Sequence, residues 1–217
     1  MTTLEALIAD VQACTACERV LHSHILGAGN GVPTARVMFV GEAPGRLGAG
    51  RTGVPFHGDE SGRRFEAFLD VAGLTRTDVF VTNAILCNPI DLKERNRRPL
   101  TSEVRRCLPF LEAQVRVVDP EVVVALGDVA LSALGLVEAH AATLRGDCGR
   151  DLPWFGRRLV PLYHPGRQST LHRADALQRD DWQRLGRMLE ERQLRGLTSK
   201  STPMPLSGAA GVRQAMK

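Results

Sequence analysis

Three polar residues stand where buried apolar runs of this sequence end, and together they could carry acid–base and hydrogen-bonding chemistry. Glu42 lies in GEAPG after the run RVMFV, Asn83 lies in VFVTNAI, and His164 opens HPG after RRLVPLY. Each has an ordinary structural explanation, because a Glu can cap a helix, an Asn can form an Asx turn and a single His is usually structural. A carboxylate, an amide and an imidazole at three strand ends, beside glycine-rich backbone, favour a functional site.

Five cysteines form a second group of residues with chemical potential. Cys14 and Cys17 are spaced CxxC on or beside the first expected helix, Cys87 follows the second expected strand, and Cys107 lies one turn into the next helix. Four thiolates suffice for a zinc ion or an iron–sulfur cluster, and the spacing does not choose between them. The alternative is that these cysteines are small buried core residues. Cys148 is isolated, and we expect it to remain a free thiol.

The surrounding elements must bring these residues to one place. Wholly apolar strands separated by helices belong to a parallel sheet that is covered on both faces. We therefore predict an α/β fold, a three-layer αβα sandwich with a central four-stranded parallel sheet, whose ligands bind at the carboxyl ends of the strands. Expected strands cover residues 36–40, 79–85, 122–126 and 158–163, and the main expected helices cover residues 3–17, 61–73, 102–118 and 175–194.

Composition bounds the class of protein. The 217 residues are 43% hydrophobic and 24% charged, which excludes disorder of the whole chain, collagen and coiled coil. The apolar runs are too short to cross a bilayer, and the N-terminus lacks the basic segment of a secretory signal. We expect a cytoplasmic protein whose residues 1–194 form one domain, followed by a disordered tail over residues 195–217.

The net charge of +4 is weak evidence for nucleic-acid binding. Residues 1–194 are formally neutral, because the tail supplies the excess through Arg195, Lys200, Arg213 and Lys217. Any electrostatic footprint must therefore come from a local cluster. The best candidate is KERNRR at residues 93–98, for which a solvated loop is an equally good explanation.

Five motifs in order resemble one known family. They are GEAPG at residues 41–45, RTGVPFHG at 51–58, VTN at 81–83, NRRPL at 96–100 and HPG at 164–166. With the four cysteines Cys14, Cys17, Cys87 and Cys107, they resemble the uracil-DNA glycosylase superfamily, above all family four, the branch with a [4Fe–4S] cluster. The resemblance runs from about Leu4 to Leu189 and implies a DNA-repair hydrolase that cleaves the N-glycosidic bond of uracil.

The resemblance also implies a role for each residue of the expected pocket. The target nucleotide is flipped out of the duplex, and bond cleavage leaves a cationic sugar and an anionic uracil. Phe56 would stack on the base, Asn83 would pair with uracil N3–H and O4, and a neutral His164 would donate to O2. Glu42 would hold the attacking water and offset the sugar cation. Backbone N–H groups around Gly41 and Ala43 would complete the pocket.

Two further features resemble family five, the branch with broader specificity. The stretches GRLGAGRTG…GDESG and HPGRQSTLHR are similar to that branch, whereas Glu42 is the carboxylate that family five lacks. Gly166 stands where family four usually has Ser. Asp59, in GDESG, is consequently the rival of Glu42 for positioning water, and helix capping is its alternative role. We favour Glu42.

The resemblance further implies uracil-containing DNA as the partner and a [4Fe–4S] cluster on the four cysteines. Arg167, Gln168 and Leu171 would form the loop that fills the gap left by the flipped base, while Arg97 and Arg98 would contact phosphates. We expect a monomer that contacts no membrane, with a cluster that is structural. Two alternatives remain: an iron–sulfur nucleic-acid-binding or electron-transfer protein without hydrolase activity, and a zinc-stabilised nucleotide-binding domain.

Overall fold

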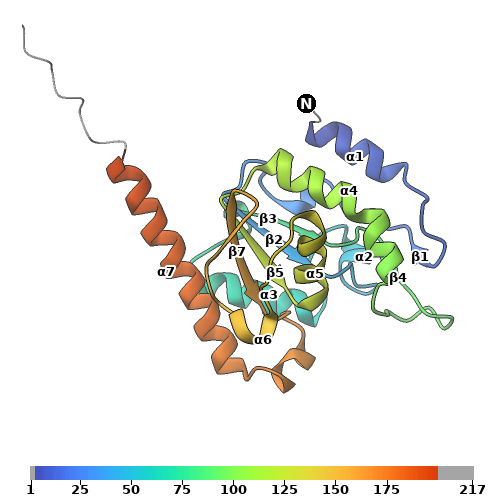
Figure 1. The fold of residues 1–217 in the computed structure, drawn as a ribbon. Coiled ribbons are helices and arrows are strands. Elements are labelled where there is room, and N and C mark those ends of the chain that lie inside the picture. Colours follow the sequence, from blue (N-terminus) through green and yellow to red (C-terminus); the bar gives the residue numbers. More distant parts are fainter. Residues whose placement is uncertain (1–2, 200–217) are drawn as a thin grey trace, which may run out of the picture.

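The computed structural model describes residues 3–199, and it describes side chains up to residue 194. Helices and strands alternate along most of the chain, as Figure 1 shows. The helices are α1 (Leu4–Gln12), α2 (Ala49–Thr52), α3 (Glu60–Val71), α4 (Thr101–Val118), α5 (Asp128–Val137), α6 (Leu144–Asp147) and α7 (Asp175–Ser199). The strands are β1 (Val20–Leu21), β2 (Val37–Gly41), β3 (Val79–Asn83), β4 (Asn88–Pro89), β5 (Val122–Leu126), β6 (Leu152–Trp154) and β7 (Arg157–Leu162).

The central sheet has five strands in the order β3-β2-β5-β7-β6. The first four are parallel neighbours, with Val37 paired to both Val79 and Val122. The four-stranded parallel sheet predicted from the sequence is therefore its centre, and the antiparallel edge strand β6 is an addition. This strand escapes prediction because it has only three residues and contains Pro153. A tight turn through Phe155 and Gly156, both with positive φ, joins β6 to β7.

Helices cover both faces of the sheet, which confirms the predicted three-layer αβα sandwich. Alternate residues of a strand point to opposite faces, so Met38 and Val40 pack with residues of α1, α4 and α5, while Val37 and Phe39 pack with residues of α3 and α7. Figure 1 shows α1 and α4 over one side of the sheet and α7 along the other. Trp182 of α7 is fully buried and stacks on Phe39 and Phe68, each with 5.3 Å between ring centroids.

Two helix boundaries differ from the prediction. Helix α1 ends at Gln12 and not near Cys17, because the following backbone bonds to the chain around His24: the His24 ring lies 2.8 Å from the Cys14 carbonyl oxygen, and the Gln12 amide donates to the His24 carbonyl. Helix α7 continues past Leu194 to Ser199, since a single glycine at position 196 lowers helix propensity without ending a helix. Residues 200–217 of the predicted tail lie outside the described residues.

None of the described helices is both long and apolar enough to span a lipid bilayer. The short ladder of β1 and β4 lies outside the central sheet, with Val20 paired to Pro89 and Leu21 to Asn88. This ladder brings the segment after α1 against the segment after β3. It therefore places the first two cysteines in the same part of the molecule as the third.

Candidate active site and cysteine pocket

A cleft of about 360 Å³ opens at the edge of the sheet where the parallel strands end. Glu42 follows β2, Asn83 ends β3 and His164 lies two residues after β7, and all three line the cleft. The strand-end arrangement predicted from the sequence thus brings a carboxylate, an amide and an imidazole together. The remaining lining residues are Ala43, Pro44, Gly45, Ala49, Phe56, Asp59, Ser61, Asn88, Pro89, Asn96, Arg97, Arg98 and Gln168.

Asn83 is only 2% exposed as a residue, its side chain lines the cleft, and in the described part of the chain no group hydrogen-bonds its amide. Gly41 lies beside it on β2, and a Cβ at Gly41 would stand 2.5 Å from Asn83 Oδ1 and 2.7 Å from the Phe56 ring. Gly41 therefore allows these two side chains to approach each other, and it does not itself line the cleft. The oxygen of the Asn83 side chain can accept and its nitrogen can donate, so the amide is free to hydrogen-bond a ligand in the cleft.

Phe56 occupies a position between core and cleft. Its backbone has a positive φ of 50°, which is uncommon for a bulky residue, and its carbonyl oxygen accepts a hydrogen bond of 2.6 Å from Arg76. The ring stacks on Phe65 at 4.8 Å between centroids and lies 5.4 Å from the His164 ring. The contact with Phe65 makes the Phe56 ring part of the core, and the same ring also lines the cleft.

The tautomer of His164 follows from its hydrogen bond. The backbone N–H of Gly166 donates to His164 Nδ1 at 2.9 Å, so the proton of the neutral ring is on Nε2. Burial lowers the pKa of His164 to about 4, against the opposing charge of Asp59, and the ring is therefore neutral at physiological pH. A Cβ at Gly166 would stand 2.8 Å from Nδ1, so glycine at this position gives the short approach room.

Glu42 is half-buried at the mouth of the same cleft. Burial raises the pKa of its carboxyl group, the positive charge of Arg98 opposes that shift, and the negative charge of Asp128 adds to it. Arg98 and Asp128 form an ion pair of 2.5 Å beside it. The net shift is upward, so burial disfavours the ionised form of Glu42 and the nearby charge of Arg98 partly offsets this effect.

Asp59 caps a helix, which is a structural role that Glu42 does not have. It is the N-cap of α3, and its Oδ1 accepts a hydrogen bond of 2.8 Å from the backbone N–H of Gly62. Its other oxygen lies against Gly48, where an added Cβ would stand only 2.2 Å away. The helix-capping role proposed as its alternative is therefore present, although Asp59 also lines the cleft.

Two cleft residues had no role in the sequence analysis. The Asn88 amide donates to the Pro44 carbonyl oxygen at 2.6 Å and lies 3.2 Å from Asn96 Oδ1, which accepts the backbone N–H of Arg46 at 3.0 Å. These bonds hold the glycine-rich loop after β2 around the cleft. Asn96 belongs to the quoted motif NRRPL, but a bond to a loop 50 residues away leaves no local signal in the sequence.

The structure does not favour the predicted contact between Arg97 and a phosphate. The Arg97 guanidinium binds both carboxylate oxygens of the buried Glu103, at 2.6 and 2.9 Å, and also donates to the carbonyl oxygens of Arg19 and Ile90. Because its donors are committed to the protein, Arg97 ties the loop before α4 together. Arg98 differs, since its side chain is 62% exposed at the rim of the cleft.

The expected loop after HPG forms a 3₁₀ helix, η3 (Arg167–Leu171), beside the cleft. Gln168 lines the cleft, Arg167 is exposed, and Leu171 is 82% exposed, which is unusual for a large apolar side chain. The loop is anchored on one side by Arg64, which donates to the Pro165 carbonyl oxygen at 2.7 Å. On the other side the ion pair of Arg173 with the buried Asp181 fixes it to α7.

Cys14, Cys17, Cys87 and Cys107 surround a separate pocket, whose other walls include Val20, Ile85, Leu86 and Phe110. Burial raises the pKa of Cys87, and that of Cys107 to about 12, and the neighbouring cysteines add to both shifts. The four thiols are therefore close enough to interact electrostatically. Cys148 lies apart from them and its thiol contacts Asp181 at 3.3 Å.

Comparisons with known proteins show the family of this chain. The family model of the uracil DNA glycosylase superfamily matches residues 28–186. A type-4 uracil-DNA glycosylase of Thermotoga maritima is 34% identical over 163 residues, which are 75% of this chain and 81% of that protein. A type-5 uracil-DNA glycosylase of Thermus thermophilus is 32% identical over 200 residues, which cover 76% of this chain and 88% of that protein. Relatives of both types are thus similar to this chain, which belongs to the uracil-DNA glycosylase superfamily.

Proposed function

We propose that this protein hydrolyses the N-glycosidic bond between uracil and deoxyribose in DNA and leaves an abasic site. The observation that carries this proposal is the Asn83 amide, which no described group hydrogen-bonds and which shares one cleft with a neutral His164 whose proton is on Nε2. Both groups can meet the edge of a single flipped base. The names of the relatives, type-4 and type-5 uracil-DNA glycosylases, support the same activity.

Base selection follows from the donors and acceptors of the amide. Asn83 Oδ1 can accept the N3–H of uracil while Nδ2 donates to O4, whereas cytosine presents an unprotonated N3 and an amino group at the same positions. The Phe56 ring supplies an apolar platform for the face of the base. A mismatched pair costs less to open than a matched one, so uracil opposite guanine is the expected best duplex substrate.

Bond cleavage places charge at two positions. His164 donates a hydrogen bond from Nε2 to O2 of the departing uracil, where negative charge collects, and loss of one such donor typically costs about 2.7–4 kcal/mol of barrier. Glu42 holds the attacking water and offsets the positive charge of the sugar. Asp59 is the weaker candidate for this second role, because one of its oxygens is committed to the N-cap of α3.

The surface around the cleft fits a flipped nucleotide in a duplex. Leu171 at the end of η3 would enter the base stack, with Arg167 and Gln168 beside it. Arg98, which also lines the cleft, would contact a phosphate in a role without sequence preference. All of these residues come from one chain, and we propose a monomer that acts on DNA in the cytoplasm.

The cysteine pocket fits an iron–sulfur cluster by its donor set. Cys14, Cys17, Cys87 and Cys107 supply four thiols around one pocket with otherwise largely apolar walls, and thiolates are the ligands that hold [4Fe–4S] clusters. When bound, the cluster would supply structural cross-linking between the segment after α1, the segment after β3 and helix α4. Hydrolysis requires no electron transfer, so no step of the reaction is assigned to it.

A cleavage panel tests the proposed function. Single- and double-stranded oligonucleotides with uracil, hypoxanthine, xanthine or thymine are incubated with the protein, and abasic sites are counted after alkaline strand scission. We expect cleavage at uracil, and thymine, which presents the same N3–H and O4 to Asn83, tests whether the pocket excludes a 5-methyl group. Binding of uracil-containing DNA without abasic sites would favour the alternative, an iron–sulfur nucleic-acid-binding protein that does not hydrolyse DNA.

A further inference from the structure

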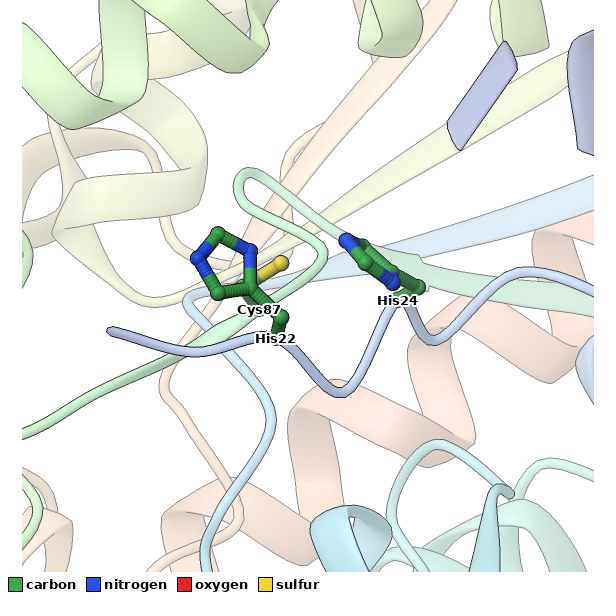
Figure 2. A group of neighbouring side chains, drawn as sticks. All are labelled: His22, His24 and Cys87. Carbon is green, nitrogen blue, oxygen red and sulfur yellow. The ribbon is translucent and has the colours of Figure 1, made fainter. Parts of the chain in front are cut away.

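A tighter group of metal-ligand atoms lies at the margin of the cysteine pocket. His22, His24 and Cys87 each offer one nitrogen or sulfur atom, and these three atoms lie within 4.8 Å of one another. Figure 2 shows the two imidazole rings on either side of the Cys87 sulfur. Ligands of a single ion must be this close, whereas four thiols around a cluster are held apart by its inorganic core.

The backbone holds this arrangement in place. Leu21 pairs with Asn88 in the β1–β4 ladder, so the next residues along the two segments, His22 and Cys87, face each other. Beyond them the Ile25 N–H donates to the Leu86 carbonyl oxygen at 2.8 Å. The two histidines and the cysteine are thus fixed by hydrogen bonds on both sides, and metal binding needs little rearrangement of the chain.

The two imidazoles are in forms suited to a metal. His24 Nε2 lies 2.8 Å from the Cys14 carbonyl oxygen, so it donates there and leaves the lone pair of Nδ1 free. Histidines that bind metals commonly donate their other ring N–H to a backbone carbonyl in this way. His22 is exposed and forms no hydrogen bond or ion pair with the described residues.

We propose that His22, His24 and Cys87 bind one divalent transition-metal ion of the zinc type. Two imidazole nitrogens and one thiolate suit such an ion, and a water molecule takes the fourth tetrahedral position. Binding releases the thiol proton of Cys87 to solvent. Cys87 is also one of the four residues assigned to the cluster, so the ion and the cluster cannot be bound at the same time. This competition rests on the proposed cluster, whereas the ion site does not.

Cobalt(II) is the probe for the ion site, because its thiolate and ligand-field absorption bands report coordination directly. The full-length Cys17→Ala variant removes a ligand of the cluster and none of the ion. We expect it to bind one Co²⁺ with a thiolate band. The same variant carrying His22→Ala or His24→Ala should bind Co²⁺ at least tenfold more weakly. Two results would overturn the proposal and assign the ion to the four cysteines. One is that Cys17→Ala abolishes Co²⁺ binding, and the other is that both histidine substitutions leave it unchanged.

A competition experiment covers the case in which Cys17→Ala does not fold. The wild-type chain is reconstituted with iron and sulfide, with and without Zn²⁺, and its iron content is measured. Zinc should lower iron incorporation in the wild type and much less in the His22→Ala and His24→Ala variants. An equal loss of iron in all three proteins would contradict the site. The iron content without zinc tests the cluster separately.

Discussion

The cleft and the cysteine pocket are built in opposite ways. The cleft lies at the ends of parallel strands and is lined by polar groups such as Asn83 and His164, whose hydrogen-bonding capacity is not used up within the protein. The cysteine pocket lies outside the central sheet, between short segments and helix α4, and its largest lining side chains include Phe110 and Leu86. The proposed chemistry is therefore placed at the ends of the sheet strands, while the four thiols come from α4 and from segments with little regular structure of their own.

One short segment nevertheless serves both regions. Asn83 ends β3 in the cleft, Cys87 follows in the pocket, and Asn88 returns to the cleft, where it binds the Pro44 carbonyl oxygen. A second link is the ion pair of Arg97, which lines the cleft, with Glu103, which lines the pocket. Damage to the pocket should consequently reach the cleft through these bonds.

The largest expected effects are confined to the cleft. Asn83→Ala and His164→Ala should each lower the single-turnover rate on uracil-containing DNA by about 10²–10³-fold, because each removes a hydrogen bond that matters most in the transition state. Thermal melting should change little, since Asn83 is the last residue of β3, His164 follows β7, and both side chains line the cleft. A rate near that of the wild type in either variant would remove that residue from the catalytic set.

The link between the two regions can be broken at Glu103. Glu103→Ala leaves the Arg97 guanidinium partly buried without its carboxylate, and loss of one partner of a buried ion pair typically costs about 3–5 kcal/mol of stability. Urea unfolding measures this change, with Glu112→Ala as the control. Glu112 pairs with Arg116 on the exposed face of the same helix, where about 0.5 kcal/mol is expected. Equal losses in the two variants would argue against the link.

A smaller effect concerns the pH dependence of cleavage. The Arg98 charge favours the ionised form of Glu42, so Arg98→Ala should raise the pKa of that carboxyl group and move the acid limb of the rate profile to higher pH. Asp128→Asn removes a negative charge and should move the limb to lower pH. Single-turnover rates at saturating enzyme separate this effect from DNA binding. Arg95→Ala, whose side chain pairs with Asp91, should leave the limb in place.

Substitution of Cys148 is expected to have no effect on the cluster. Cys148 lies apart from the other four cysteines, with its thiol against Asp181, so Cys148→Ala should leave the iron and sulfide content of the purified protein unchanged. Loss of iron in this variant would show that the cluster ligands are wrongly assigned. Such a result would also remove the separation between the two regions.

The sequence predicts the parts of this molecule that depend on local pattern. Strand β5 begins and ends at the predicted residues Val122 and Leu126, because an apolar run between polar turns leaves no alternative. The strand-end rule predicts that Glu42, Asn83 and His164 meet in one cleft. Contacts between distant loops leave no such pattern, and the commitment of Arg97 to Glu103 therefore required the structure.

Glu42, and not Asp59, is proposed to position the attacking water. The most direct test of this role is the single-turnover rate of Glu42→Gln and Asp59→Asn on one U:G duplex at saturating enzyme. Asparagine preserves the N-cap of α3, so the Asp59 variant should fold and cleave with a mild loss. We predict that Glu42→Gln abolishes cleavage. A greater loss for Asp59→Asn than for Glu42→Gln would contradict the account.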